Sequence, residues 1–408
     1  MIDIDYRSRT DAGVRPVEFA AFHDQVLGPR LHGNNGRLAA RGIARLGLPP
    51  LAIEVDGRAV TYVARNGSVE IVAGRTSDAV VAAMDAALFS DLVLDLRTTT
   101  SALLSGAVRL PPADAQSFLQ WDLILRSMID GRAIHEPGAI DFRDRAGRPL
   151  DLHRVFAAGD DREDMLQFVG QAGFLIIHGL FTADEMAEVS ADLDRIAPSY
   201  QPGDGRSWWA RTRSAGNRIV RLKDVQDRSA VVARLLRDPR YLGIADLWPE
   251  RYPRALRTAS PIDACIKPVD TVEGVSDMNW HKDCSLGRHS YDCCNFGVGF
   301  SVTDSSDDHG QLCVVAGSHR TQIPMTRTGA MAAELPGDLD LPVIPLPTQA
   351  GDVTVHLSCV MHRALPPRHT ERRVMYSGYI LEEDHRLPFT GDSYAALQDR
   401  TKPPTPTT

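Results

Sequence analysis

The second half of the chain contains a series of short apolar runs separated by glycine-containing turns. The runs are rich in β-branched residues, as is typical of strands in a sheet. They read CIKPVD, NFGVGFSVTD, QLCVVAG, GDVTVHLSCVMH and RVMYSGYIL. This pattern restricts the second half to an all-β core whose strands are partly buried on both faces. Upstream, GFLIIHGLF (173–181) predicts one more buried strand, and Thr182 and Glu185 have the spacing of a capping box before a helix through Ile196.

The first third has a different pattern. Residues 51–72 alternate short apolar runs with the turn pairs Asp56-Gly57 and Asn66-Gly67, which predicts a three-stranded antiparallel meander. Apolar spacing then predicts further elements up to residue 128. These are a strand in Ser77–Met84, a helix over Asp85–Leu96, a short strand near Ala107–Leu110 and a helix over Ala115–Met128. Together they describe a separate α+β unit.

These patterns divide the chain into domains. Residues 1–132 form the small α+β domain, and the Gly-, Pro- and charge-rich residues 133–150 form a linker. A β-rich domain covers 151–395, and the tail 396–408, with TKPPTPTT at its end, is expected to be disordered. The predicted fold class is therefore α+β, with a β core and flanking helices preceded by a smaller α+β domain.

The amino-acid composition disfavours several classes of binding partner. The net charge is −8 and the pI is about 5.9, which disfavours nucleic acid and anionic membranes as partners. No apolar run is long enough to span a membrane and the start lacks a secretion signal, so we expect a cytoplasmic protein. The six cysteines all follow residue 264 without C-x-x-C spacing. We therefore expect free thiols rather than a zinc site or disulfides.

The segment MNWHKDCSLG (278–287) contains the pair His281 and Asp283. Residues two apart in a strand project from the same face, so this pair would present an imidazole beside a carboxylate. A third ligand has to come from elsewhere, and residues 351–374 offer His356, His362 and His369. Two histidines and one carboxylate on one face are the ligand set of non-haem Fe(II) oxygenases.

The chain resembles the phytanoyl-CoA dioxygenase-like family of Fe(II)/2-oxoglutarate oxygenases over roughly residues 160–385. The resemblance rests on Trp280-His281-Lys282-Asp283, on the Gly317-Ser318-His319 turn, and on His362 followed eleven residues later by Arg373. In the family, the distal histidine and the arginine that binds 2-oxoglutarate have this same separation. Pro367 stands eleven residues after His356, so His356 does not satisfy the spacing.

The resemblance implies a double-stranded β-helix (jelly-roll) core and a set of ligands. His281, Asp283 and His362 would hold Fe(II), Arg373 would anchor 2-oxoglutarate, and Lys267 would line the pocket. O2 and 2-oxoglutarate would be consumed with release of succinate and CO2. The expected reaction is hydroxylation of an unactivated carbon in a small molecule, such as an apolar compound or a natural product of secondary metabolism. Desaturation, epimerisation and ring formation remain alternatives, whereas halogenation is disfavoured because Asp283 is present.

Other residues near these motifs have weaker claims to the site. His356 stays a ligand candidate because it lies six residues before His362 and would face the same way on a continuous strand. His369 and Glu371 repeat the His-x-carboxylate spacing, but in a Pro- and Arg-rich turn that predicts a solvated loop. Arg372 would point away from Arg373 and is expected to be structural. His319 is expected to form structural hydrogen bonds.

Two tryptophans, Trp208 and Trp209, lie in the sequence SWWART, where we expect a loop. At least one of them would cover the substrate, with a core role for one of the pair as the alternative.

Residues 30–132 resemble sterol-carrier-like domains, through the element order and SGAVRL before the last helix. The resemblance implies an apolar ligand between sheet and helices, and a filled core without a ligand remains the alternative. His23 and His32 are expected to be solvated or capping, so this domain would supply no metal ligand.

Two further functions stay open. One is a lipid- or metabolite-binding protein without catalysis, and the other is a metal-dependent isomerase that needs no 2-oxoglutarate. Neither the substrate nor the oligomeric state follows from the sequence.

Overall fold

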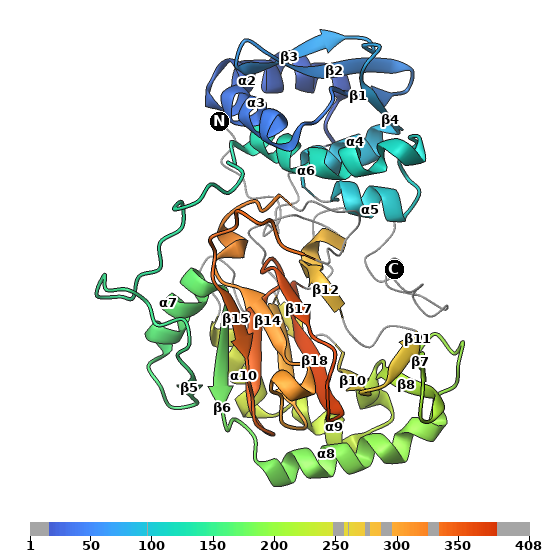
Figure 1. Cartoon of the computed structure of the whole chain (residues 1–408), viewed down its shortest axis with the longest axis vertical. Coiled ribbons are helices and arrows are strands. Elements are labelled where there is room, and N and C mark those ends of the chain that lie inside the picture. Colours follow the sequence, from blue (N-terminus) through green and yellow to red (C-terminus); the bar gives the residue numbers. More distant parts are fainter. Residues whose placement is uncertain are drawn as a thin grey trace.

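A computed structural model of the chain describes residues 16–95, 97–247, 257–259, 261–273, 278–286, 296–324 and 334–381. An N-terminal group of helices and strands lies at one end of the molecule, and a β-rich group follows it along the long axis (Figure 1). The predicted tail, residues 396–408, lies outside the described residues.

The N-terminal group is built on a four-stranded sheet with the order β3-β2-β1-β4. Its strands are β1 (Leu51–Val55), β2 (Arg58–Arg65), β3 (Ser68–Ala73) and β4 (Val80–Met84). The predicted meander is confirmed, and its two-residue turns require left-handed backbone at Asp56-Gly57 and Asn66-Gly67, where every φ is positive. β4 pairs in parallel with β1, so the chain crosses over before it rejoins the sheet.

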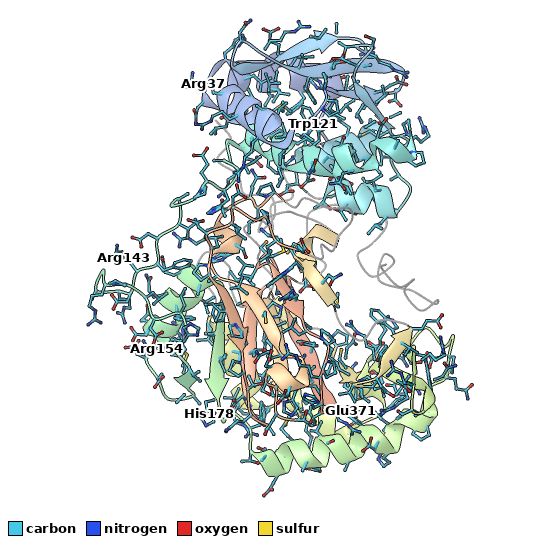
Figure 2. The ribbon with its side chains drawn as sticks, in the orientation of Figure 1. Arg37, Trp121, Arg143, Arg154, His178 and Glu371 are labelled. Carbon is cyan, nitrogen blue, oxygen red and sulfur yellow. The ribbon has the colours of Figure 1, made fainter. Side chains whose placement is uncertain are left out.

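Helices pack against this sheet and fill its core. They are α1 (Phe19–Ala21), the π-helical η1 (Phe22–Leu27), α2 (Gly28–His32), α3 (Asn34–Leu46), α4 (Ala86–Val93), α5 (Thr99–Leu104), η2 (Pro112–Asp114) and α6 (Ala115–Asp130). Both predicted helices are present as α4 and α6. Phe118 and Trp121 of α6 are fully buried with Tyr62 of β2, and Figure 2 shows Trp121 inside this group. Binding of an apolar ligand by this unit stays a prediction.

Two N-terminal expectations are wrong. The strand near Ala107–Leu110 is reduced to one bridge between Arg109 and Ala83. His23 is buried rather than solvated, because both ring nitrogens have partners: Nδ1 lies 2.6 Å from the Phe19 carbonyl and Nε2 lies 2.7 Å from the Tyr62 hydroxyl. His32 is exposed, as expected.

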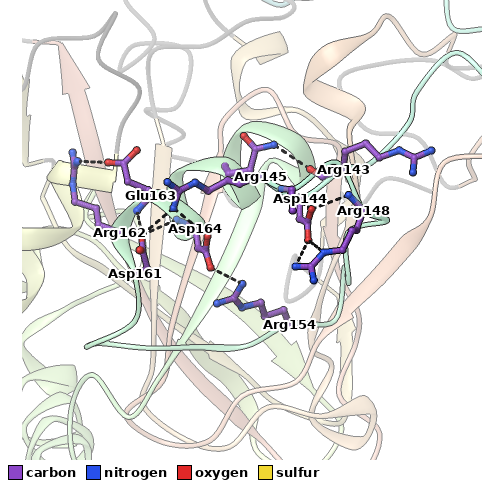
Figure 3. Close-up of polar contacts among 11 residues, drawn as sticks. Arg143, Asp144, Arg145, Arg148, Arg154, Asp161, Arg162, Glu163 and Asp164 are labelled. Atoms are coloured by element: carbon purple, nitrogen blue, oxygen red, sulfur yellow. Dashed lines mark hydrogen bonds and ion pairs between the residues drawn. The ribbon is translucent and has the colours of Figure 1, made fainter.

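The linker residues pack against both groups rather than running free between them. Ile134 belongs to the N-terminal core, while His135 is buried and its Nε2 lies 2.6 Å from Asp340. Ile140 and Phe142 pack around Trp280 in the β-rich group. Further along, Arg145 and Arg154 form ion pairs with Asp164 of α7 (Arg162–Ala172) (Figure 3). The linker therefore reaches the element that carries the candidate ligand His281.

The β-rich group contains a large and a small sheet. The large sheet has the order β11-β7-β8-β10-β18-β13-β16-β6-β5, with β9 also paired to β18, and the small sheet has the order β12-β17-β14-β15. The strands are β5 (Phe156–Ala157), β6 (Phe174–His178), β7 (Ser207–Thr212), β8 (Gly216–Leu222), β9 (Arg257–Ala259), β10 (Asp263–Lys267), β11 (Thr271–Glu273), β12 (Met278–His281), β13 (Phe296–Ser301), β14 (Leu312–Val315), β15 (Val343–Leu346), β16 (Val353–Leu357), β17 (His362–Ala364) and β18 (Arg372–Leu381).

Residues of both sheets belong to one contiguous core, among them Phe296, Val355 and Val314. The two-sheet β core of the predicted fold class is therefore confirmed. Helices and short 3-10 turns complete the group. They are α8 (Ala183–Ile196), η3 (Ala197–Ser199), η4 (Val225–Asp227), α9 (Ala230–Leu235), α10 (Pro239–Ile244), η5 (Ala245–Leu247), η7 (Asp283–Leu286), η8 (Asp307–His309) and η9 (Ser318–Arg320).

The predicted SWWART loop is wrong, because Trp208 and Trp209 lie in β7 and pair with β8. The guanidinium of Arg221 stacks on Trp208, 4.7 Å from the ring centre, and the Trp209 ring nitrogen donates to Ser207. Both tryptophans are partly buried. Among the described helices, none combines the length and apolar character needed to cross a membrane.

The capping box of α8 leads to a stability prediction. The Thr182 hydroxyl accepts from the Glu185 backbone N–H, and the Glu185 carboxylate accepts in return from the Thr182 N–H. Thr182→Ala should lower the free energy of unfolding by about 1 kcal/mol, as loss of such a cap usually does. The measurement is urea denaturation of the full chain. Thr182→Ser retains the hydroxyl and should stay close to the unchanged protein, so equal losses in both variants would contradict the capping role.

Candidate metal centre

Two strands of the small sheet bring the candidate histidines together. β12 and β17 run antiparallel with His281 directly opposite His362, and the ring centres lie 4.2 Å apart. Residues opposite each other in such a pair project from the same face. Both histidines are buried. The Trp280 ring packs under the Arg363 guanidinium, 4.5 Å away, which ties the two strands together beside the histidines.

Asp283 meets the histidines from a turn rather than from a strand. β12 ends at His281, and Asp283 begins the 3-10 turn η7, so the expectation that both lie on one strand is wrong. The two side chains still lie side by side. Asp283 Oδ1 is 3.5 Å from His281 Nε2 and 3.8 Å from His362 Nε2. The ligand atoms of the three residues all lie within 4.8 Å of one another.

Backbone carbonyls orient the two imidazoles. His281 Nδ1 lies 2.7 Å from the Asn279 carbonyl, and His362 Nδ1 lies 2.9 Å from the Val360 carbonyl. A carbonyl only accepts, so each Nδ1 carries the proton and donates it. Each Nε2 is then left with a lone pair that points toward Asp283. Fixing the tautomer through the second ring nitrogen is the usual arrangement of a metal-ligating histidine.

The charge states suit a metal as well. Burial, together with the neighbouring His281, lowers the pKa of His362 to about 3, so its imidazole is neutral near pH 7. Burial would raise the pKa of Asp283, but His362, His281 and His356 outweigh it and hold that pKa well below the usual range. A neutral imidazole and an ionised carboxylate are the forms in which these side chains bind divalent cations.

His356 lies next to the triad although it is on the other sheet. β16 ends at Leu357, so His356 and His362 are not on one continuous strand, yet their ring centres are 4.6 Å apart. Its Nε2 is 3.8 Å from Asp283 Oδ2, and its buried Nδ1 has no hydrogen-bond partner. His356 thus faces the second carboxylate oxygen, while His281 and His362 face the first.

The other sequence candidates lie apart from the triad. His319 Nε2 lies 3.0 Å from the Gly170 carbonyl, and burial lowers the pKa of this side chain to about 4. His369 is largely exposed, as expected for a loop. Arg373 extends toward α8, where its guanidinium donates to Ser190 and pairs with Asp194 at 2.9 Å and with Glu371 at 3.2 Å. Figure 2 shows Glu371 at the end of the sheets next to α8, whereas β12 lies nearer the N-terminal group.

Arg372 occupies the interior position instead. It is 2% exposed, and its Nη atoms donate to the Gly310 carbonyl at 2.6 Å, to Ser305 and to the Tyr376 hydroxyl at 3.1 Å. All of these partners are neutral, and its buried Nε has no hydrogen-bond partner. Within the described residues, no carboxylate pairs with this guanidinium. From the sequence, Arg372 was expected to have a structural role. Strand alternation predicted that the two arginines face opposite ways, but it did not predict which of them faces inward.

Lys267 is next to Arg372 across the β10–β18 pair. It is 3% exposed, and its Nζ donates to the Leu365 carbonyl at 2.6 Å. Directly paired residues share a face, so two buried cationic side chains project into the same part of the interior. A small cavity near Arg372 is lined by Arg372, Arg373, Thr354 and Tyr376, among other residues, and Lys267 is not part of its lining.

Contacts along β13 connect Arg372 to the side chains beside the triad. On β13, Gly297 lies against His356, and Gly299, two residues further on the same face, lies against Thr354 and Tyr376. A Cβ at Gly297 would come within 2.9 Å of the His356 ring, and one at Gly299 within 2.5 Å of the Thr354 hydroxyl. Tyr376 in turn contacts Arg372. Arg372 and His356, which lies beside the triad, are therefore linked through side chains that pack on one face of β13.

Comparison with known proteins agrees with these motifs. The family model described as phytanoyl-CoA dioxygenase (PhyH) matches residues 169–375. The ectoine dioxygenase of Bordetella bronchiseptica is 29% identical over 164 residues, which are 38% of this chain and 49% of that protein. The ectoine dioxygenase of Streptomyces coelicolor is 30% identical over 172 residues, which are 40% and 52%. The chain thus spans about half the length of these curated relatives.

Solved structures with a similar arrangement include HygX of Streptomyces hygroscopicus with nickel and 2-oxoglutarate bound. It is 21% identical, with a TM-score of 0.42 over 58% of this chain and 96% of that one. The epimerase SnoN, in a complex with Fe3+, α-ketoglutarate and nogalamycin RO, is 20% identical, with a TM-score of 0.42 over 57% and 92%.

The geometry predicts that the triad binds one divalent cation per chain. His281→Ala, Asp283→Ala and His362→Ala should each abolish tight binding of Fe(II) or Co(II), because two ligands from different elements do not replace three. Calorimetric titration of the anaerobic protein measures this, with circular dichroism to verify folding. His369→Ala, which removes an exposed histidine, is the control and should bind normally. Normal binding by His362→Ala together with loss of binding in His356→Ala would show that the third ligand is His356 and not His362.

Proposed function

The chain belongs to the phytanoyl-CoA dioxygenase family, and from this premise we propose that it is an Fe(II)- and 2-oxoglutarate-dependent oxygenase that hydroxylates a small molecule. The observations that carry the proposal are the His281–Asp283–His362 triad, whose ligand atoms lie within 4.8 Å of one another, and the buried Arg372 with its neutral partners. A metal at the triad and an arginine further inside the core are what a chelating dicarboxylate needs for simultaneous binding at both ends.

The triad residues would hold the iron. Two oriented imidazole nitrogens and one carboxylate oxygen make up a facial set that leaves coordination positions for a co-substrate and dioxygen. Iron bound there would supply the oxidising chemistry that couples conversion of 2-oxoglutarate to succinate and CO2 with hydroxylation of a carbon–hydrogen bond. His356 is assigned a positioning role, because it faces the Asp283 oxygen that the other histidines do not. His281 and His362 are buried, whereas the Asp283 side chain is 35% exposed, so the site is open to solvent or substrate on the Asp283 side.

The anchor for the far carboxylate is assigned to Arg372 rather than to Arg373. A buried guanidinium with neutral partners and an unsatisfied Nε has charge and hydrogen-bonding capacity for an anion. Arg373 already pairs with the carboxylates of Asp194 and Glu371. Lys267 beside Arg372 adds a second positive charge, which fits its expected place in the pocket. In this proposal the anchoring arginine lies ten residues after His362, instead of the eleven that the family resemblance implied.

The substrate is assigned to the class of small molecules. The relatives that match over about half their length are named for ectoine, a small molecule, and the family match covers the whole metal-binding segment. The test of the overall proposal is succinate formation by the Fe(II)-loaded chain with 2-oxoglutarate and O2, with and without candidate substrates. A chain that binds Fe(II) but never forms succinate would favour the metabolite-binding or isomerase alternative.

A matched pair of variants tests the anchor. Arg372→Lys keeps the charge but loses the planar fork, so the apparent affinity for 2-oxoglutarate should fall by about tenfold or more, the equivalent of one charge-assisted hydrogen bond. Arg373→Lys should leave that affinity unchanged. Titration of the Fe(II) protein with 2-oxoglutarate, followed by the metal-to-ligand absorbance, reports binding separately from turnover. The opposite result, with loss only in Arg373→Lys, would restore Arg373 as the anchor.

The division into a small N-terminal domain and an oxygenase domain is also proposed. Two separate hydrophobic clusters support it: one draws on residues 17–134, and the other on residues from 142 onward. Ion pairs such as Arg45–Asp338 and His135–Asp340 join the two. Ile140 and Phe142 pack around Trp280, next to the ligand His281, so these linker residues belong with the oxygenase domain.

This arrangement determines where a truncation should begin. A chain starting at Ala133 keeps His135, Ile140 and Phe142, and it should still bind Fe(II) and 2-oxoglutarate. A chain starting at Asp144 loses these contacts with the element that carries His281, and its Fe(II) affinity should be lower. Calorimetry and circular dichroism on both proteins provide the comparison. Loss of metal binding by the folded longer chain would contradict the proposed division.

A further inference from the structure

Two cysteine thiols, those of Cys284 and Cys359, lie next to each other near the candidate metal ligands. The Sγ atoms of Cys284 and Cys359 are 3.5 Å apart, and both residues are buried. They pack against each other as a small cluster of their own, separate from the larger cores. At this distance the two sulfurs are not bonded to each other. Cys284 and Cys359 are 75 residues apart in the chain, so the fold has brought them together.

The backbones that carry the two thiols are also in contact. The Cys284 N–H donates to the Ser358 carbonyl at 3.3 Å, which joins η7 to the turn between β16 and β17. A disulfide has an S–S bond of about 2.05 Å and needs Cα atoms within about 7 Å of each other. Because the backbones are already hydrogen-bonded, closing the remaining gap of about 1.5 Å requires side-chain rotation and a small local shift.

Both thiols are close in sequence to metal ligands. Cys284 directly follows Asp283, and Cys359 lies in the turn that leads to His362. A bond between the sulfurs would pull η7 against this turn. The carboxylate of Asp283 and the imidazole of His362 would then shift relative to each other, and metal binding tolerates little such displacement.

We propose that Cys284 and Cys359 are a site of reversible oxidation, at which a hydroperoxide converts the two thiols to an intramolecular disulfide that weakens the metal centre. With hydrogen peroxide as oxidant, one sulfur attacks the O–O bond and becomes a sulfenic acid while one water leaves. The second sulfur attacks the first, the S–S bond forms, and the sulfenic oxygen leaves as a second water with the remaining thiol proton. Two thiols are oxidised by two electrons and one peroxide is reduced. The effect on metal binding rests on the proposed function, whereas the disulfide does not.

The experiment uses the full chain, reduced and free of metal, titrated with hydrogen peroxide. Remaining thiols are alkylated, and the protein is digested without reduction for peptide mass spectrometry. The expected product is a cross-linked peptide pair that contains Cys284 and Cys359. After peroxide removal, the affinity for Co(II) should be at least tenfold lower than before oxidation, and treatment with a phosphine reductant should restore it.

Three variants sharpen the comparison. Cys359→Ser and Cys284→Ala should each lack the cross-link and retain Co(II) affinity after peroxide. Cys313→Ser is the matched control: Cys313 is also buried, but in another cluster around Trp280, and its removal should leave cross-linking intact. Circular dichroism verifies that each variant is folded. Using two different single variants guards against one of them failing to fold.

The outcomes separate the parts of the proposal. Oxidation of other cysteines without a Cys284–Cys359 cross-link would overturn the modification site. A cross-link that leaves Co(II) affinity unchanged would overturn its effect on the metal centre. If the reduced protein bound no Co(II) at all, the metal centre itself would be contradicted, and with it the coupling, while the cross-link would still decide whether the disulfide forms.

Discussion

The antiparallel pairing of β12 with β17 is the constraint on which the candidate site depends. It sets His281 opposite His362 on one face of the small sheet, and the carbonyls of Asn279 and Val360 fix both tautomers. Asp283 completes the set from a turn, where a residue can approach both rings at once. The strand pairing fixes the two histidines and the turn fixes Asp283, so the geometry of the set is determined by the backbone rather than by flexible side chains.

The interior of the β core has an unusual charge distribution for an acidic protein. Lys267 and Arg372 project side by side from paired strands, and both are almost completely buried. Arg372 has only neutral hydrogen-bond partners among the described residues, so burying its charge costs free energy unless an anion compensates it. The glycines of β13 let the side chains of His356, Thr354 and Tyr376 pack closely against this strand, between Arg372 and the triad.

Residues of the predicted linker and the pair of thiols contact segments that carry the candidate ligands: β12, η7 and the turn before β17. Ile140 and Phe142 pack around Trp280, next to His281, and the contact between Cys284 and Cys359 links η7 to the turn before His362. The candidate ligands His281, Asp283 and His362 are therefore each next in sequence to a residue of one of these two small clusters. Such a position permits a local change, a cleaved linker or an oxidised thiol pair, to act on the site without unfolding the sheets.

The sequence by itself determined the β-rich core, the hairpin turns at Asp56-Gly57 and Asn66-Gly67, and the cap of α8, because each depends on local periodicity or turn chemistry. It also determined the candidate ligands His281, Asp283 and His362, through their residue spacing. Only the tertiary structure decided that Arg372 faces inward and Arg373 meets α8, that His356 reaches Asp283, and that Cys284 meets Cys359. The physical reason is strand parity and pairing. Alternation shows that neighbouring residues face opposite ways, but which face is inside depends on how the strand pairs and on what packs against it.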